Sequence, residues 1–247
     1  MSKQLDTEMS DVLTIEKQEA CWTFVLNRPA KMNALSSDLI EALIAGVTQA
    51  HQEDIPLLVF TGEGKNFSAG FDFTDYEAQS EGDLVLRFIR IETLLNLVAT
   101  SPSLTLALAH GKNFGAGVDL FAVCKQRFCT ADARFRMPGL KFGLVLGTQR
   151  FQEIVGTRNA MAILGDTRMF SAEEALNMGF IHDIVERDQW PEKINAAQTL
   201  AQGLDAATRA SFYRVLDNNR ANDDMAALVH SAARPGLKAR IKSYLSA

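Results

Sequence analysis

Short stretches in which hydrophobic residues alternate with polar ones, or follow one another without interruption, recur through the first two-thirds of the chain. Trp22, Phe24 and Leu26 alternate, as in a strand with one buried face. Continuous apolar runs, typical of strands buried on both faces, occupy residues 57–60 and 104–109. We expect strands, the first two forming a hairpin, at residues 12–16, 21–26, 57–60, 104–109 and 128–130 and around Phe135.

A helical period separates these strands. Leu39, Leu43 and Val47 form one apolar helix face, and Ser36 or Ser37 can cap the start of that helix. Two further helices between strands are expected at residues 84–98 and 118–125.

From residue 148 onward the pattern is mostly helical. Ser171 and Glu174 have the spacing of a capping box, and Gly179 is placed to end the helix that they start. Pro191 suits the first turn of another helix. Strands that alternate with helices, followed by helices alone, predict an α/β protein with a helical tail.

Composition fits a folded domain. The 247 residues are 47% hydrophobic and 22% charged, close to the globular average, which excludes disorder and collagen-like repeats. The net charge of −5 argues against a nucleic-acid module, because such modules usually carry a basic face. We expect a main domain, residues 1–190, and a helical segment, residues 191–247.

The cysteines and the lengths of the apolar runs indicate the cellular compartment. Cys21, Cys124 and Cys129 lack the spacing of a redox or zinc motif and are expected to be buried and reduced. The first ten residues lack the apolar stretch of a signal peptide, and no run is long enough to span a bilayer. We expect a soluble, cytoplasmic protein.

Several familiar active-site motifs are absent. Gly64-Lys65 lacks the spacing of a P-loop, FGAGVDL lacks the third glycine of a dinucleotide fingerprint, and Ser68 is not in a G-x-S-x-G elbow. The four histidines have no metal-like spacing, so no metal site is expected.

Two glycine-containing turns remain as candidates for chemistry. One is Ser68-Ala69-Gly70, and the other, Gly115-Ala116-Gly117, opens a predicted helix. Small residues let a ligand approach the main-chain N–H groups, and a helix start adds positive potential. Two convergent amides of this kind can form an oxyanion hole for an ester or thioester carbonyl. Packing alone is the other explanation of such turns, and the local spacing leaves both open.

Four sequence blocks resemble the enoyl-CoA hydratase/isomerase (crotonase) superfamily. These blocks are LNRPAKMNALS, TGEGKNFSAGFDF, AHGKNFGAGVDLFAVCKQRF and FRMPGLKFGLVLG followed by TQRF. Their order and separation match the family over roughly residues 10–190. The resemblance implies a spiral of repeated ββα units, with C-terminal helices that support a homotrimer or a dimer of trimers.

The resemblance also implies a ligand and a set of site residues. The substrate would be an acyl-CoA, so coenzyme A would be part of the substrate and no separate cofactor is expected. The matching oxyanion-hole amides are those of Ala69 and Ala116. The other matching positions would lie along the coenzyme A arm or near its nucleotide end: Gly70, Phe71, Asp72, Gly117 and Lys31.

The carboxylates determine which reaction such a site can perform. Hydratases of this family use two glutamates, and the matching positions here hold Asp119 and Gly139. Glycine can neither activate water nor deliver a proton. Asp119 could move a proton between two carbons if its apolar surroundings raise its pKa. Another acid could come from the loop around residues 75–77.

We therefore expect double-bond isomerisation or related enolate chemistry ahead of ordinary hydration. The alternative is a non-catalytic member of the fold that binds acyl-CoA or RNA. The acidic balance disfavours RNA, because a negative field repels phosphates.

Overall fold

The computed structural model describes residues 6–216 and 220–247, so only the second half of the ten-residue N-terminal segment lies within it. Its main sheet has the strand order β1-β2-β3-β4-β5-β7-β10. The bounds of these strands are β1 Asp6–Met9, β2 Leu13–Gln18, β3 Cys21–Leu26, β4 Leu57–Gly62, β5 Leu104–Ala109, β7 Gln126–Cys129 and β10 Asp183–Ile184.

Strand direction divides this sheet into two parts. β2 and β3 form the predicted antiparallel hairpin, and β1 extends it. From β3 to β10 the neighbouring strands are parallel. A second sheet has the order β6-β8-β9, with bounds β6 Lys112–Phe114, β8 Arg134–Arg136 and β9 Phe170–Ser171.

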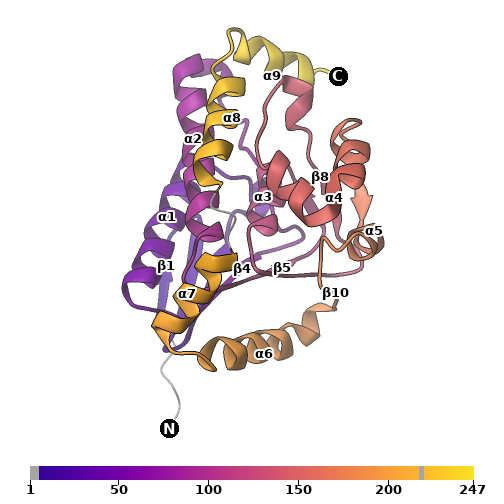
Figure 1. Cartoon of the computed structure of the whole chain (residues 1–247). Helices are drawn as coiled ribbons and strands as arrows, with labels where there is room; N and C mark the ends of the chain where they lie inside the picture. Colours follow the sequence, from indigo (N-terminus) through magenta and orange to yellow (C-terminus); the bar gives the residue numbers. More distant parts are fainter. Residues whose placement is uncertain (1–5, 217–219) are drawn as a thin grey trace.

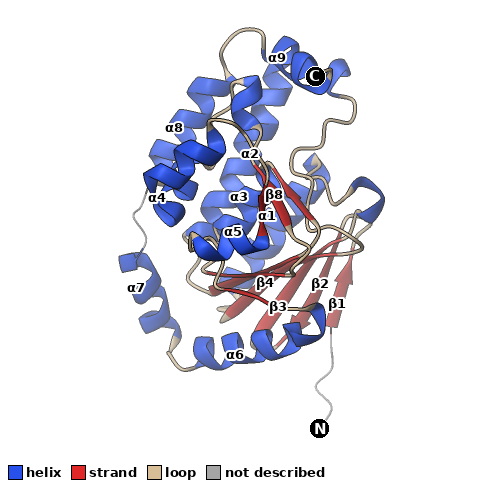
Figure 2. Cartoon of the chain, turned by 90° about the vertical axis from the view of Figure 1, so that its right-hand side faces the viewer, coloured by secondary structure: helices blue, strands red, loops and turns tan. Residues whose placement is uncertain are grey.

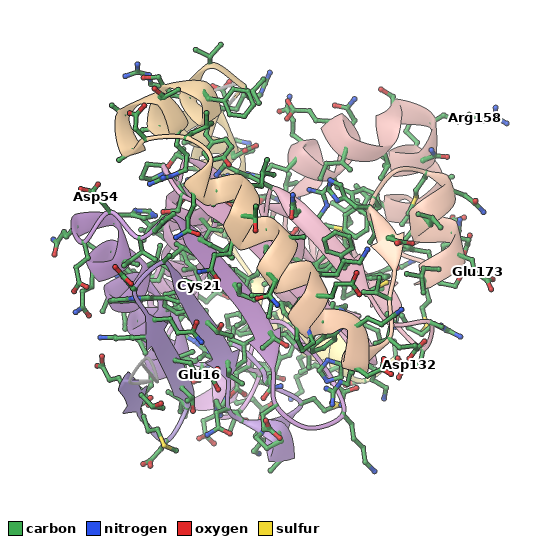
Figure 3. The ribbon with its side chains drawn as sticks, turned by 90° about the horizontal axis from the view of Figure 1, so that it is seen from below. Glu16, Cys21, Asp54, Asp132, Arg158 and Glu173 are labelled. Atoms are coloured by element: carbon green, nitrogen blue, oxygen red, sulfur yellow. The ribbon has the colours of Figure 1, made fainter. Side chains whose placement is uncertain are left out.

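Helices cover both faces of the main sheet (Figures 1 and 2). The connecting helices α1 (Ser37–Gln52), α2 (Glu81–Ala99) and α3 (Ala116–Ala122) lie on one side, whereas α6 (Trp190–Gln202) crosses the other (Figure 3). Between α6 and the sheet, a smaller apolar cluster joins Ala197 and Ala201 of α6 to Cys21 of β3 and to buried side chains of β4 and β5. All three cysteines are buried and free.

Local signals explain where several helices begin and end. The Ser36 hydroxyl accepts a hydrogen bond from the Leu39 amide, as an N-cap does, and the Ser171–Glu174 capping box is present. The α5 helix (Ala172–Asn177) ends just before Gly179, whose φ is 73°. The predicted helix at 118–125 is shifted: α3 starts at Ala116 and ends at Ala122.

The remaining helices close the other sides of the molecule (Figure 1). They are α4 (Thr148–Leu164), α7 (Ala206–Leu216), α8 (Ala221–Ala232) and α9 (Leu237–Leu245). Leu228 and Ala232 of α8 and Ile241 of α9 belong to the same core as the connecting helices. The segment 191–247 therefore shares its core with the main domain, and its role in assembly stays a prediction. Within the described residues, no helix is long and apolar enough to cross a membrane.

Candidate active site

The first glycine-containing turn follows β4 and offers a different amide from the one predicted. The Ala69 N–H donates to the Met32 carbonyl at 2.8 Å, and the Gly70 N–H to the Ser68 hydroxyl at 3.1 Å. The Phe71 N–H has no acceptor in the described part of the chain. The prediction of Ala69 as a donor is therefore wrong, because the neighbouring loop already occupies its amide, and Phe71 carries the free one.

The second turn links β6 to α3. Gly115 has φ 50° and donates its N–H to the Arg136 carbonyl at 2.8 Å. Ala116 is the first residue of α3, where backbone N–H groups have no acceptor within the helix. No acceptor outside the helix reaches this amide in the described part of the chain, and the amide lies at the positive end of a short helix.

Glycines bring the two turns together. Gly70 has φ 80°, and a Cβ atom there would lie 3.0 Å from the Ala116 nitrogen and would collide with the Phe114 carbonyl. A Cβ at Gly117 would lie 2.7 Å from the Ser68 Cβ. Both glycines thus pack backbone against backbone, and neither lines the cavity described next. The close approach of the backbones is what requires these glycines, and their contact with a ligand stays a prediction.

A cavity of about 110 Å³ opens in front of these turns. Ala69, Phe71, Ala116 and Asp119 line it, which brings together residues that are 50 positions apart in the chain. The rest of its wall is mostly apolar and aromatic, with Phe73, Phe88, Phe114 and Phe142 among the lining side chains. An apolar pocket with a few convergent polar groups is typical of a small-molecule site.

Asp119 is the one carboxylate that lines this cavity among the described residues. Asp119 is 3% exposed, and no hydrogen-bond partner from the described residues reaches its Oδ1 atom. Burial raises the pKa of this carboxyl well above its usual value of 3.8, and the nearby charge of Glu92 adds to the shift. Gly147, with φ 61°, leaves the space that the carboxyl occupies, because a Cβ there would collide with Oδ1.

A buried ionic cluster lies behind Asp119. Arg150 on α4 contacts Glu92 of α2 at 2.6 Å and Asp224 of α8 at 3.1 Å. Glu92 is fully buried, and desolvation raises its pKa even though it faces Arg150. Arg150 lowers the pKa of Asp119, whereas Glu92 and Asp224 raise it. The charges of this cluster therefore influence the pKa of Asp119.

The other predicted residues lie outside the cavity. The Asp72 carboxylate accepts a hydrogen bond from the Thr74 amide at 2.9 Å and forms an ion pair with Arg28 at 2.8 Å, so its side chain organises the turn. Lys31 is exposed on the 3₁₀ turn η1 (Pro29–Lys31) and does not line the cavity. The loop around residues 75–77 forms the turn η2 (Tyr76–Ala78), which also lies away from the lining.

Three polar side chains of the cavity were not predicted from the sequence. They are Arg136 on β8, Thr148 at the start of α4 and Tyr244 on α9. No local motif marks them. The Glu92 cluster does have a signal, because Glu92 interrupts the apolar face that Phe88, Ile91 and Leu95 form. Within the described residues, no group of three or more metal-ligating side chains comes together.

Comparisons with known proteins identify the family and the fold of this chain. The sequence model of the family described as "Enoyl-CoA hydratase/isomerase" matches residues 16–230. A probable enoyl-CoA hydratase of Bacillus subtilis is 31% identical over 204 residues, covering 78% of this chain and 77% of its own. The mitochondrial Delta(3,5)-Delta(2,4)-dienoyl-CoA isomerase of Rattus norvegicus is 30% identical, covering 82% of this chain and 68% of its own.

A solved structure from Bordetella parapertussis, described as a putative enoyl-CoA hydratase/isomerase, is 63% identical. It superposes with a TM-score of 0.96 and covers 96% of this chain and 100% of its own. An enoyl-CoA hydratase structure from Bacillus halodurans, at 21% identity and a TM-score of 0.83, shares the fold.

Proposed function

Because this chain belongs to the enoyl-CoA hydratase/isomerase family, we propose that it is an acyl-CoA enzyme that stabilises a thioester enolate. The family and its crotonase fold are shown by the match over most of the chain and by the structural neighbours. The acyl-CoA and the reaction are our proposal, and the geometry of the cavity supports them.

The amides of Phe71 and Ala116 form the proposed oxyanion hole. Both lie on the cavity wall, neither has an acceptor in the described chain, and the Gly70 contact holds their turns together. Two N–H groups aimed at a thioester oxygen stabilise the negative charge that develops when the α-carbon loses a proton. Removing one such donor typically costs about 2.7–4 kcal/mol of transition-state stabilisation.

Asp119 is the proposed acid and base. As a carboxylate it takes a proton from C2 of a 3-enoyl thioester, and the electron pair spreads over the dienolate. As a carboxylic acid it returns the proton to C4, so the double bond moves from C3=C4 to C2=C3 with no net gain or loss of atoms. A buried carboxyl with a raised pKa holds the proton between these steps, because returning it to water is slow in an apolar cavity.

The observation that carries this proposal is that Asp119 is the single carboxylate among the described residues that line the cavity. Gly139, where a second acid would be expected, also lines it and supplies no titratable group. Hydration needs one group to direct water and another to deliver a proton, so isomerisation ranks ahead of it. The test is to compare turnover of 3-enoyl-CoA and 2-enoyl-CoA substrates. Fast hydration of 2-enoyl-CoA without isomerisation of 3-enoyl-CoA would reverse the ranking.

Asp119→Asn separates catalysis from binding. It keeps the shape of the side chain and removes the titratable oxygen, so we expect turnover to fall at least a hundredfold while acyl-CoA affinity changes little. If the wild type binds acyl-CoA but turns over neither substrate class, the protein is instead a non-catalytic acyl-CoA binder, an alternative that the absence of an acid at Gly139 favours.

The proposed assembly is a homotrimer or a dimer of trimers. Helix α7 exposes three apolar side chains, Phe212 at 49%, Val215 at 80% and Leu216 at 64%, which is more than a solvated helix face usually shows. Light scattering coupled to size exclusion would test this, and a monomer at micromolar concentration would refute it. Residues 191–247 are the segment proposed to mediate the contacts.

A further inference from the structure

Arg136 is the one cationic side chain among the described residues that line the active-site cavity. It alternates with Phe135 along β8, so the buried Phe135 faces the core and Arg136 faces the opposite side. We infer that Arg136 selects acyl groups that end in a carboxylate, so that the substrates are thioesters of dicarboxylic acids. This assignment rests on the proposed acyl-CoA function.

A backbone hydrogen bond fixes one nitrogen of the Arg136 guanidinium. Its Nε–H donates to the Thr167 carbonyl at 3.0 Å. Thr167 is 2% exposed, and its φ of 48° is a conformation that β-branched residues rarely adopt. A strained backbone persists only where its surroundings fix it, and it often marks a functional site. Here the strained residue presents the carbonyl that orients Arg136.

The two terminal nitrogens of Arg136 have no partner in the described part of the chain. No hydrogen bond reaches them, and no ion pair joins Arg136 to Asp119 or to another described carboxylate. With Nε fixed, the remaining N–H groups form a fork that matches the two oxygens of a carboxylate. A half-buried, unpaired guanidinium on an apolar wall is therefore a suitable anion receptor.

The position of Arg136 assigns this anion to the acyl group. The backbone carbonyl of Arg136 accepts a hydrogen bond from the Gly115 amide at 2.8 Å, and Gly115 directly precedes Ala116, the donor of the proposed oxyanion hole. The phosphates of coenzyme A are separated from the thioester by the whole pantetheine arm. An anion held by Arg136 while the thioester lies at Ala116 therefore belongs to the acyl side.

Calorimetric titration with matched saturated thioesters tests the assignment without requiring turnover. Butanoyl-, pentanoyl- and hexanoyl-CoA are compared with the thioesters of the same chain length that end in a carboxylate: 3-carboxypropanoyl-, 4-carboxybutanoyl- and 5-carboxypentanoyl-CoA. We expect the wild type to bind at least one carboxylate compound 10- to 100-fold more tightly than its partner, as a charge-assisted bidentate contact allows.

Variants then assign the preference to the side chain. Arg136→Gln should abolish the preference, because it weakens binding of the thioesters with a terminal carboxylate far more than binding of their partners without one, and Arg136→Lys should retain part of the preference. Lys141→Gln is the matched control, because it removes an exposed cation nearby that does not line the cavity. Thermal unfolding would confirm that each variant is folded.

Three outcomes would overturn the assignment, and they differ from one another. Equal affinity of the wild type for both members of every pair would remove the selectivity. Equal weakening of all compounds and of free coenzyme A by Arg136→Gln would place the contact on the coenzyme A phosphates. Binding of no thioester would contradict the proposed acyl-CoA function itself.

Discussion

Arg150→Met isolates the contribution of the buried ionic cluster to stability. Arg150 is 13% exposed, Glu92 1% and Asp224 9%, so solvent screens these charges little. Methionine keeps much of the volume but leaves two buried carboxylates without their cation. Removing one partner of a buried ion pair typically destabilises a protein by about 3–5 kcal/mol. We expect a loss of that size in the free energy of unfolding at pH 7, measured by urea denaturation.

The loss of stability in Arg150→Met should also depend on pH, and the pKa of Glu92 determines the direction of that dependence. Burial already raises the folded-state pKa of Glu92 above its usual value of 4.5, and losing Arg150 raises it further. A carboxyl with a raised folded-state pKa destabilises the fold above that pKa and is relieved as the pH falls through it. The difference between variant and wild type should therefore shrink from pH 7 to pH 5.

An exposed ion pair between α2 and α1 is the control. Arg90 contacts Glu41 at 2.5 Å, but the two side chains are 35% and 52% exposed. Arg90→Met should change stability by less than about 1 kcal/mol. A loss below about 1 kcal/mol for Arg150→Met at pH 7, or a loss independent of pH, would refute the view that Arg150 neutralises buried charge.

Three further predictions concern single positions. Ala116→Pro removes the proposed oxyanion donor at a helix position that tolerates proline, so kcat should fall about 10²- to 10³-fold while the Tm changes little; an unchanged kcat would exclude this amide from the mechanism. Gly147→Ala should lower both stability and turnover, because φ is 61° and the added methyl displaces the Asp119 carboxyl; wild-type activity would contradict that packing. Burial lowers the pKa of His51 and His110 to about 4, so stability should fall as the pH drops from about 6.5 to 4, because the unfolded chain then binds protons that the folded chain does not. His51→Gln should flatten this slope in acid titrations of unfolding, and an unaltered slope would show that the ring titrates normally.

Corrections at the site have one physical cause. Ala69 and Phe71 lie two residues apart in the same turn, and nothing in their side chains reveals which amide is free. The Met32 carbonyl decides it, and Met32 comes from a loop more than 30 positions earlier. Likewise, Gly70 and Gly117 are needed because backbones from another turn approach them, a requirement that a glycine in the sequence does not distinguish from ligand contact.

The sequence by itself determined the α/β alternation, the hairpin, the helix caps and the family, since each depends on residues close together in the chain or on motifs in a fixed order. It also showed that position 139, where hydratases of the family have a second glutamate, holds a glycine without an acidic side chain. Only the tertiary structure decided which amides stay unpaired, that Glu92, Arg150 and Asp224 meet behind Asp119, and that Arg136 faces the same cavity. These properties depend on desolvation and on hydrogen-bond partners, which distant segments of the chain supply only after they pack together.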